Sequence, residues 1–513
     1  MSRFRESKRI ISLGIVSMLM LTAGCSTKTE VSEVETTPVE QTAEVAVEEK
    51  DSKPFLELES LIALSDVKED LIPDVTSEKW SLGIASSKPI VDPNGEYVIA
   101  VEHEKMARYN IGSNEKVWEV PVYGGIYSYV IEGDKLFMSE KYAYKKTKED
   151  GHVICLDANT GEEIWKYNVQ EDMAKVVAKY KPEDADFKVF CNIQMTNADG
   201  LLYILGSTSW VKEKVNDKTE VLMCLDMDGN KMWETQSHGL PGMLSMSAMN
   251  VIDGVLVMGN YSYGDAVNGP ASVNAFDIKN GETAWKYEIA NDAEMSYNGK
   301  TSLSVGVVDG KIVAIAAFGK AYVLDTQGNL INEFVLFEPE KYEDVMLCTS
   351  VSRSSTGFGD GEIIVAPKKT TVKGSSSYNS ESPAQHSAVG LVKVFDLEGN
   401  VKWNFRLGGS VTNMKLEGDY LVLATSHNQD TMDYDYCGVY VFDISQDGSA
   451  EEVNVQDESA LEKYVGSYQT EGAILYNSVD VSADGSTIIA MTWPTRVDVE
   501  KHGNHEMYIL DIN

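Results

Sequence analysis

One short pattern recurs along the chain and constrains its fold more than any other feature. Residues 153–165 (VICLDANTGEEIW) read as an apolar strand, a tight turn with Asp and Gly, and a second short strand that ends in Trp. Close copies occupy residues 221–233, 273–285 and 391–403, and weaker copies occupy 106–118, 321–334 and 439–448. Repetition at a fixed spacing indicates an array of equivalent supersecondary units.

A second element accompanies each copy, namely a turn that contains Gly after an acidic residue or Asn, followed by a β-rich run. Eight such segments occur, at residues 92–100, 132–138, 199–205, 253–258, 309–314, 360–365, 417–422 and 484–490. An Asp-Gly turn between β-rich runs predicts a hairpin, so each unit supplies four strands. The repeat Asp positions lie 47 to 51 residues apart, or 68 to 71 where a longer connection intervenes. This spacing is typical of the four-stranded antiparallel blades of a β-propeller.

The two ends of the repeat region complement each other. Residues 507–513 (MYILDIN) form the third strand of the last unit without a fourth, whereas residues 78–80 (EKW) carry the fourth-strand signature without a third. An N-terminal strand is therefore expected to complete the last blade and close the ring. We predict an all-β, eight-bladed propeller over residues 78–513; seven blades with one degenerate unit is the alternative.

The repeat itself is explained by structure. The Asp carboxylate can accept hydrogen bonds from N–H groups of its own turn, Gly allows a positive φ, and the aromatic residue is expected where one blade packs on the next. The residues assigned this structural role are Trp80, Trp118, Asp157, Gly161, Trp165, Asp226, Trp233, Asp277, Gly281, Trp285, Asp325, Asp396, Trp403 and Asp443.

The N-terminal residues are read as export and anchoring segments. Residues 1–24 combine a basic start with an apolar run too short to span a bilayer, which is typical of a signal peptide. The sequence LTAGC that ends at Cys25 resembles the lipobox of bacterial lipoproteins, whose cysteine takes a diacylglyceryl group, with palmitate among the acyl chains. An ordinary signal peptide with an incidental Cys25 is the alternative. Residues 25–54 are predicted to be a disordered acidic tether, and residues 55–77 an extension with a possible short helix over 55–71.

Charge and cysteine content exclude some functions. The formal net charge of −36 argues against nucleic acid, since phosphate binding needs clustered Lys and Arg. Beyond Cys25, five cysteines remain at positions 155, 191, 224, 348 and 437, and no two are adjacent or spaced as C-x-x-C. Buried free thiols are therefore expected.

The repeat resembles that of the pyrroloquinoline-quinone (PQQ) propellers, and together with the leader it resembles the BamB-like lipoproteins of that superfamily. In the quinoprotein dehydrogenases of the same superfamily, PQQ lies against a vicinal disulfide and binds calcium through Glu, Asn and Asp side chains. Because this sequence has no adjacent cysteines, no PQQ and no other cofactor is predicted. The resemblance implies the fold, whereas one blade type serves many functions.

Function is expected in the long connections. These join strands two and three or pass between blades, so they emerge on one face of the propeller, and two of them, 172–180 and 457–468, are predicted to be helical. The candidate binding-face residues in these connections are Tyr142, Tyr144, Trp210, Tyr261, Tyr263, Asp265, Asp433, Tyr434, Asp435, Trp493 and Arg496. The Ser-rich connection over residues 368–388 is predicted to be mobile.

A search for catalytic motifs finds none. H-E-x-x-H, G-x-S-x-G and the P-loop are absent, and no metal site is predicted, although Asp433 and Asp435 could contribute oxygen ligands to Ca²⁺. The leading hypothesis is a non-enzymatic, lipid-anchored propeller on the extracytoplasmic side of the cell membrane, which acts as a scaffold for a protein or cell-envelope partner. The alternatives are a carbohydrate- or peptide-binding surface lipoprotein, and an enzyme of unrecognised type that uses the propeller funnel.

Overall fold

Strands make up almost all of the regular structure of this chain. The computed structural model describes residues 55–513 apart from 73–87, 103–104, 123–125, 141–150, 181–185, 213–214, 236–247, 264–269, 291–299, 352–354, 360, 368, 374–382, 408, 410, 427–436, 446–447, 449, 456–463 and 498–499. The region from residue 53 to 513 forms one unit, and residues 1–52 belong to a separate one.

The described residues form eight sheets of four or five strands, here called blades 1 to 8. Blade 1 contains β2 (Lys88–Val91), β3 (Tyr97–Val101), β4 (Lys105–Asn110) and β5 (Lys116–Pro121), and blade 2 contains β6 (Ile126–Glu132), β7 (Lys135–Glu140), β8 (His152–Asp157) and β9 (Glu163–Asn168). Blade 3 contains β10 (Asp186–Ala198), β11 (Leu201–Lys212), β12 (Val215–Asp226) and β13 (Lys231–Glu234), and blade 4 contains β14 (Asn250–Ile252), β15 (Val255–Gly259), β17 (Ser272–Asp277) and β18 (Thr283–Glu288).

The second half of the chain repeats this arrangement. Blade 5 contains β19 (Lys300–Val308), β20 (Lys311–Ala316), β21 (Lys320–Leu324) and β22 (Leu330–Val335), with β16 (Tyr261–Tyr263) added, and blade 6 contains β25 (Thr356–Gly359), β26 (Glu362–Val365), β28 (Leu391–Phe395), β29 (Val401–Arg406) and β33 (Val453–Asn454). Blade 7 contains β30 (Val411–Glu417), β31 (Tyr420–Thr425), β32 (Gly438–Asp443) and β34 (Tyr464–Gln469), and blade 8 contains β35 (Ala473–Val481), β36 (Thr487–Trp493), β39 (Glu506–Ile512) and β1 (Leu56–Ala63).

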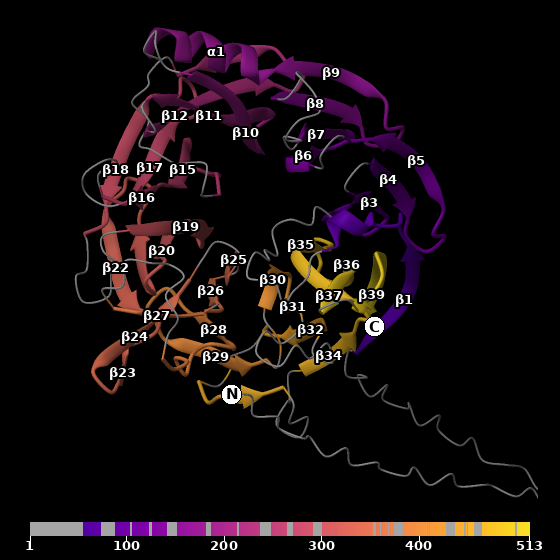
Figure 1. The fold of residues 1–513 in the computed structure, drawn as a ribbon, viewed down its shortest axis with the longest axis vertical. Helices are drawn as coiled ribbons and strands as arrows, with labels where there is room; N and C mark the ends of the chain where they lie inside the picture. Colours follow the sequence, from indigo (N-terminus) through magenta and orange to yellow (C-terminus); the bar gives the residue numbers. More distant parts are fainter. Residues whose placement is uncertain are drawn as a thin grey trace, which may run out of the picture. The chain divides into compact units, whose positions relative to one another are not determined.

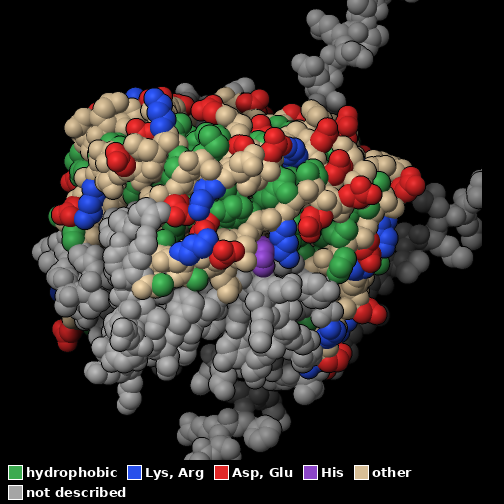
Figure 2. All heavy atoms as spheres, turned by 90° about the horizontal axis from the view of Figure 1, so that it is seen from above, with side chains coloured by type: hydrophobic (Ala, Val, Ile, Leu, Met, Phe, Trp, Pro, Cys, Tyr) green, Lys and Arg blue, Asp and Glu red, His purple; other side chains and the backbone are tan. Residues whose placement is uncertain are grey.

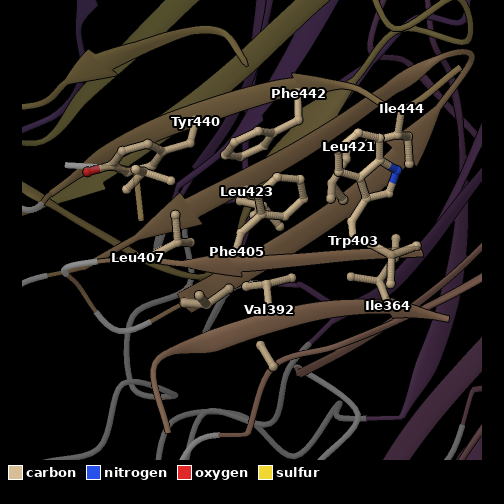
Figure 3. Close-up of a cluster of buried hydrophobic side chains, with 14 residues drawn as sticks. Ile364, Val392, Trp403, Phe405, Leu407, Leu421, Leu423, Tyr440, Phe442 and Ile444 are labelled. Atoms are coloured by element: carbon tan, nitrogen blue, oxygen red, sulfur yellow. The ribbon is translucent and has the colours of Figure 1, made fainter. Parts of the chain in front are cut away.

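These sheets follow one another around a ring, with the first strand of each blade nearest the centre (Figure 1). Eight clusters of buried apolar side chains each join two neighbouring blades, and one of them joins blade 8 to blade 1. The cluster between blades 6 and 7 shows the packing: the rings of Phe405 and Phe442 stack with centroids 4.2 Å apart, and Trp403 lies parallel to Phe405 (Figure 3). The predicted all-β propeller of antiparallel four-stranded blades is confirmed.

The Asp-Gly turns have the geometry that the sequence predicts. In the turns at Asp199, Asp253 and Asp309, both this residue and the following Gly have positive φ, between 46° and 78°. Positive φ at both central residues is the type I′ turn, whose twist matches that of the strands it joins. These three hairpins therefore have two-residue loops, with the flanking residues directly paired.

Tryptophan links each of the first four blades to the next. The Nε1–H group donates to the carbonyl oxygen of the residue after the repeat Asp of the following blade: Trp118 to Ala158 at 3.1 Å, Trp165 to Met227 at 3.1 Å, Trp233 to Ile278 at 2.9 Å and Trp285 to Thr326 at 3.0 Å. The ring lies against the turn Gly, so closely that a Cβ added to Gly281 would lie 2.4 Å from Trp233. Glycine is thus needed at this position for two reasons: it allows the positive φ of the turn, and it leaves room for the tryptophan ring.

Two later joints vary this arrangement. At the joint between blades 5 and 6, Phe334 covers Gly399, and the amide Nδ2 of Asn332 takes the place of the indole as donor, 3.1 Å from the carbonyl oxygen of Leu397. At the next joint, Trp403 lies against Gly448.

The N-terminal strand that closes the ring is not the expected one. β1 pairs antiparallel with β39 from Leu56↔Ile512 to Ala63↔Glu506, so residues 56–63 supply the fourth strand of blade 8. The helix considered for residues 55–71 is wrong there: side chains alternate between half-buried and exposed along β1, and a single 3-10 turn occupies Glu69–Leu71. Trp80, the expected end of the closing strand, lies outside the described residues.

Candidate functional site

The candidate site is the face at which strands two and three are joined and the chain passes from blade to blade, here called the long-connection face. On the opposite face, most turns are short, as at 158–161 and 278–281. The long-connection face instead carries additional elements: α1 (Val169–Tyr180), a three-stranded sheet of β23 (Glu340–Tyr342), β24 (Val345–Ser350) and β27 (Lys369–Val372), and a hairpin of β37 (Thr495–Val497) and β38 (Glu500–His502).

Several connections that were expected to be loops are strands. β11 and β12 remain paired as far as Lys212↔Val215, so Trp210 lies on an extended hairpin rather than a loop. Tyr261 and Tyr263 lie on β16, which pairs with β19 of blade 5. β27 opens the Ser-rich connection and pairs with β24, while residues 374–382 lie outside the described residues. β-Branched and aromatic residues in these connections favour the extended backbone.

The predicted helix between blades 2 and 3 is present as α1. The side chain of Asn168 accepts a hydrogen bond from the N–H of Glu171 at 3.0 Å, which caps the first turn. Asp172 is nearly buried and accepts hydrogen bonds from Tyr167, from Lys175 at 3.2 Å and from Lys231 at 3.0 Å. Burial raises the pKa of the Asp172 carboxyl, but these three donors outweigh it and hold that pKa below its usual value. The charged network fixes α1 to blades 2 and 3.

One predicted connection was assigned to the wrong place. Residues 457–468 were expected to be a helical connection between blades, but Tyr464–Gln469 form the outer strand of blade 7. The segment before them therefore joins strands three and four and belongs to the opposite face. Within it, Val453–Asn454 pair in parallel with β29 of blade 6, and Glu452 forms an ion pair with Arg406.

Many of the candidate residues lie outside the described ranges. They are Cys25, Tyr142, Tyr144, Asp265, Asp433, Tyr434 and Asp435, so the proposed binding role of these positions stays a prediction. The structure describes the side chains of two of the candidates, Trp493 and Arg496.

Trp493 does not project from the surface as expected, because only 3% of it is exposed. It ends β36, its indole Nε1–H donates to the carbonyl oxygen of Leu71 at 3.3 Å, and its ring packs edge-on against His505 at 4.9 Å between centroids. Arg496, half-buried in the adjacent hairpin, forms an ion pair with Glu69. Both side chains therefore hold the segment that follows β1 against blade 8.

A cavity of about 290 Å³ lies beneath this segment, between blades 8 and 1. Ser65, Val67 and Leu71 form one wall, Trp493 and His505 form the second, and Glu102 and Lys105 at the β3–β4 connection form the third; Asp66 and Lys68 complete the lining. Val67 and Leu71 also pack on an apolar cluster that contains Cys437, Ala473 and Leu475. The cavity lies on the long-connection face, since all three walls come from connections of that face.

Sequence reasoning did not identify Glu102. One signal was available, because this acidic residue directly follows Tyr97–Val101, a strand that is buried along its whole length. A carboxylate at the end of a buried strand needs a partner. The segment 64–71 was read as part of a helix, so its position over Glu102 could not be anticipated.

A second cavity, of about 280 Å³, lies at the inner strands of blades 4 to 6, where Asn250, Ser304, Gly306 and Phe358 are among its lining residues. The described lining residues include no carboxylate, and the four described free cysteines, Cys155, Cys224, Cys348 and Cys437, lie in different sheets or connections. These residues do not fit the disulfide and carboxylate set that the resemblance implies for PQQ.

Two further findings concern the described residues only. Their His, Cys, Asp and Glu side chains form no group of three or more that could hold a metal ion. Among them, too, the helices are all too short or too polar to cross a bilayer. On the face shown in Figure 2, acidic and basic side chains of the described residues are interspersed, with hydrophobic side chains between them.

Comparison with known proteins gives the family. The family model described as outer membrane protein assembly factor BamB matches residues 72–167 and 144–333, which together span just over half of the chain. The chain belongs to this family of PQQ-like repeat β-propellers. No curated protein matches the sequence.

Solved structures with the same architecture are distant in sequence. BamB from Moraxella catarrhalis is 13% identical, with 89% of this chain and 97% of that chain covered and a TM-score of 0.45. Quinohemoprotein alcohol dehydrogenase from Comamonas testosteroni is 12% identical, with 89% of this chain and 76% of that chain covered and a TM-score of 0.53. At such an identity the likeness to the dehydrogenase concerns the fold alone.

Proposed function

We propose that this protein is a non-enzymatic interaction scaffold of the bacterial cell envelope, anchored by lipid at Cys25 and presenting its long-connection face to a protein partner. The tether of residues 25–54 would hold the propeller away from the membrane on its extracytoplasmic side. BamB, the protein that gives the family model its description, is named as an outer membrane protein assembly factor. Assembly with other proteins is therefore the role that family membership favours for this chain.

One observation carries the proposal: additional structure is concentrated on one face. Most turns of the opposite face are short, whereas the long-connection face bears α1, the β23–β24–β27 sheet and the β37–β38 hairpin. Ordered elements added to a scaffold on one side are typical of a recognition surface. The connection between β32 and β34 is an exception, and within it Val453–Asn454 pair with β29 of blade 6.

Photo-crosslinking in living cells tests which face is used. A photoreactive amino acid at Lys501, an exposed residue of β38, should yield a discrete adduct with a partner. The same substitution at Lys279, an equally exposed lysine in a turn of the opposite face, is the matched control and should yield none. Adducts of equal yield from both positions, or none from Lys501 and from Lys341 on β23, would contradict the proposal.

The anchor is tested separately. In cells supplied with labelled palmitate, the wild-type protein should acquire label and Cys25→Ala should not. If Cys25→Ala still acquires label, the lipobox assignment is wrong, whatever the outcome of the crosslinking.

A second function has one observation in its favour. The cavity between blades 8 and 1 is of a size suited to a small ligand or a single side chain, which accords with a ligand- or peptide-binding surface lipoprotein. Catalysis in the funnel remains the third hypothesis, and it would require a convergent acid–base or metal group there.

A further inference from the structure

The cavity between blades 8 and 1 has walls that are fixed by specific contacts. The N–H of Leu64 donates to the carbonyl oxygen of His505 at 3.0 Å, and the imidazole Nδ1 of His505 lies 2.9 Å from the carbonyl oxygen of Ser65. Further along, the indole of Trp493 donates to Leu71. The covering segment is thus held at both ends, so the cavity is part of the fold.

A buried carboxylate belongs to the lining of this cavity, and only one of its two oxygens accepts a hydrogen bond from the described residues. Only 2% of Glu102 is exposed, and its Oε2 accepts the N–H of Ser65 at 2.9 Å. Its other oxygen, Oε1, accepts no hydrogen bond from the described residues and has almost no exposed surface, so a ligand in the cavity reaches it through a small shift of a neighbouring side chain. A buried acceptor without a donor destabilises a protein, and the effect is larger when the acceptor is charged.

The neighbouring lysine does not supply that donor. Lys105 Nζ lies 3.9 Å from Glu102 Oε1, too far for a hydrogen bond, because it donates instead to Glu119 Oε2 at 2.9 Å. Burial lowers the pKa of the His505 imidazole and outweighs the hydrogen bond to Ser65 and the charge of Glu102, which raise it, so the uncharged imidazole is favoured. Glu102 therefore keeps an anionic acceptor without a described donor, close to the apolar lining residues Val67, Leu71 and Trp493.

We propose that this cavity binds a primary ammonium group on a short apolar body, with the ammonium donating to Glu102 Oε1 and the body lying against Val67, Leu71 and Trp493. A guanidinium fits less well, since its planar fork matches two free carboxylate oxygens and Oε2 is already engaged. The volume corresponds to about ten water molecules, which limits the ligand to a small amine or to one lysine side chain. The proposal does not depend on the lipid anchor or on the use of the rest of the face.

Calorimetry on the full-length chain tests the binding. n-Butylamine and Nα-acetyl-lysine amide are the two probes, and their uncharged counterparts are n-butanol and Nα-acetyl-norleucine amide. We expect affinities in about the millimolar range for at least one amine, and weaker binding of its counterpart by about tenfold or more. Binding of the lysine derivative identifies a lysine side chain as a possible occupant, and binding of butylamine alone identifies a free amine. Equal affinity for amine and counterpart, or no binding of either amine, overturns the proposal.

Variants tie the binding to this cavity. Glu102→Gln should weaken amine binding by about tenfold or more, because a charge-assisted hydrogen bond is lost. Glu362→Gln is the matched control: Glu362 is also nearly buried beside a lysine, Lys402 at 2.9 Å, but it lines neither cavity, so binding should stay within about twofold.

Two further variants keep the test decisive if Glu102→Gln fails to fold. Val67→Trp fills the cavity while the carboxylate remains, and it should abolish binding. Lys105→Met removes the nearest competing cation and should strengthen amine binding by about threefold or more, whereas a purely structural role of Lys105 would leave binding unchanged or weaken it. Amine binding unaltered in Val67→Trp would overturn the assignment.

Discussion

Replacement of a single turn glycine should test how the blades are joined. Gly281, in the turn between β17 and β18, has φ +73°, and a Cβ at this position would lie 2.4 Å from Cζ3 and 2.8 Å from Cε3 of Trp233. Gly281→Ala therefore has two separable effects. The backbone is strained in the left-handed region, and the tryptophan ring of the preceding blade is displaced.

The magnitude of each effect follows from the structure. A Cβ in the left-handed region costs about 1–2 kcal/mol. Displacement of Trp233 breaks its 2.9 Å hydrogen bond to Ile278, worth about 1 kcal/mol, and separates its ring from Tyr203, whose centroid lies 6.3 Å away, for about another 1 kcal/mol. We expect Gly281→Ala to lower the free energy of unfolding by about 3–4 kcal/mol in total.

The same blade supplies the control. Gly254, in the turn between β14 and β15, has φ +78°, but a Cβ there would meet nothing within 4 Å. Gly254→Ala should therefore cost only the backbone strain, about 1–2 kcal/mol. Urea unfolding followed by circular dichroism measures both values, and in a Trp233→Ala background the cost of Gly281→Ala should fall to that of Gly254→Ala. If the two glycine substitutions lower the free energy of unfolding equally in the wild-type background, the contact between Trp233 and Gly281 does not stabilise the joint.

Three other predictions follow from the described contacts. The donors to Asp172 hold its pKa below the value of about 3.9 that is usual for an unfolded chain, so its contribution to stability is full above that value and is lost as pH falls through the folded pKa. In Asp172→Asn, the urea concentration at the unfolding midpoint should therefore depend less on pH between about pH 5 and pH 2 than in the wild type. An unchanged pH dependence of this midpoint would contradict the prediction. Asn332→Leu removes the donor to Leu397 and should lower the free energy of unfolding by about 1 kcal/mol, against no change if the amide bond contributes nothing. Leu58 packs on the core, so Leu58→Asp should lower the free energy of unfolding by about 3 kcal/mol. Leu61 is 47% exposed, so Leu61→Asp should lower it by less than about 0.5 kcal/mol. Similar shifts in melting temperature for the two variants would indicate that both side chains lie on one helical face, which contradicts β1.

The sequence predicts the blades well because their signals are local. Asp199 and Gly200 must adopt positive φ to join two adjacent strands, and this requirement is written in two consecutive residues. The repeat Asp at 226 likewise accepts the N–H groups of Asp228 and Asn230, within its own turn. Eight repetitions of such signals average out the ambiguity of any single one.

The region of residues 55–71 was misread because its apolar residues fit two periods. Leu58, Leu61, Ile62 and Leu64 satisfy a helical spacing, whereas Leu56, Leu58 and Ile62 face the core when the segment is a strand with a bulge between Leu58 and Ser60. The deciding influence is the unpaired edge of β39, which lies more than 400 residues away in the sequence. A partner so distant leaves no trace in a local pattern.

The candidate site could be predicted only as a face. The order of strands fixes which connections emerge together, so the long-connection face follows from the sequence, but the fate of each connection depends on tertiary pairing. Tyr261 and Tyr263 extend along the inner strand of blade 5, and Trp493 is buried by a segment that precedes the whole ring. An aromatic residue in a connection is therefore weak evidence for an exposed binding residue, since the same side chain can instead be buried and pack the connection against the blades.

Closure by an N-terminal strand has a structural consequence for blade 8. In the other blades, the turn between strands three and four receives the outer strand of the preceding blade, as Gly281 receives Trp233. Blade 8 has no such turn, because its fourth strand, β1, comes from the other end of the repeat region. At its joint with blade 1, Ser60 donates to Asn114 at 2.9 Å, whereas the first four blades use an indole as the donor to the next blade. This joint relies on the pairing of β1 with β39 and on the segment after β1, and the cavity that Glu102 helps to line lies directly beneath that segment. The ring is thus least regular where it closes, and a group that completes the hydrogen bonding of Glu102 would act at the same place.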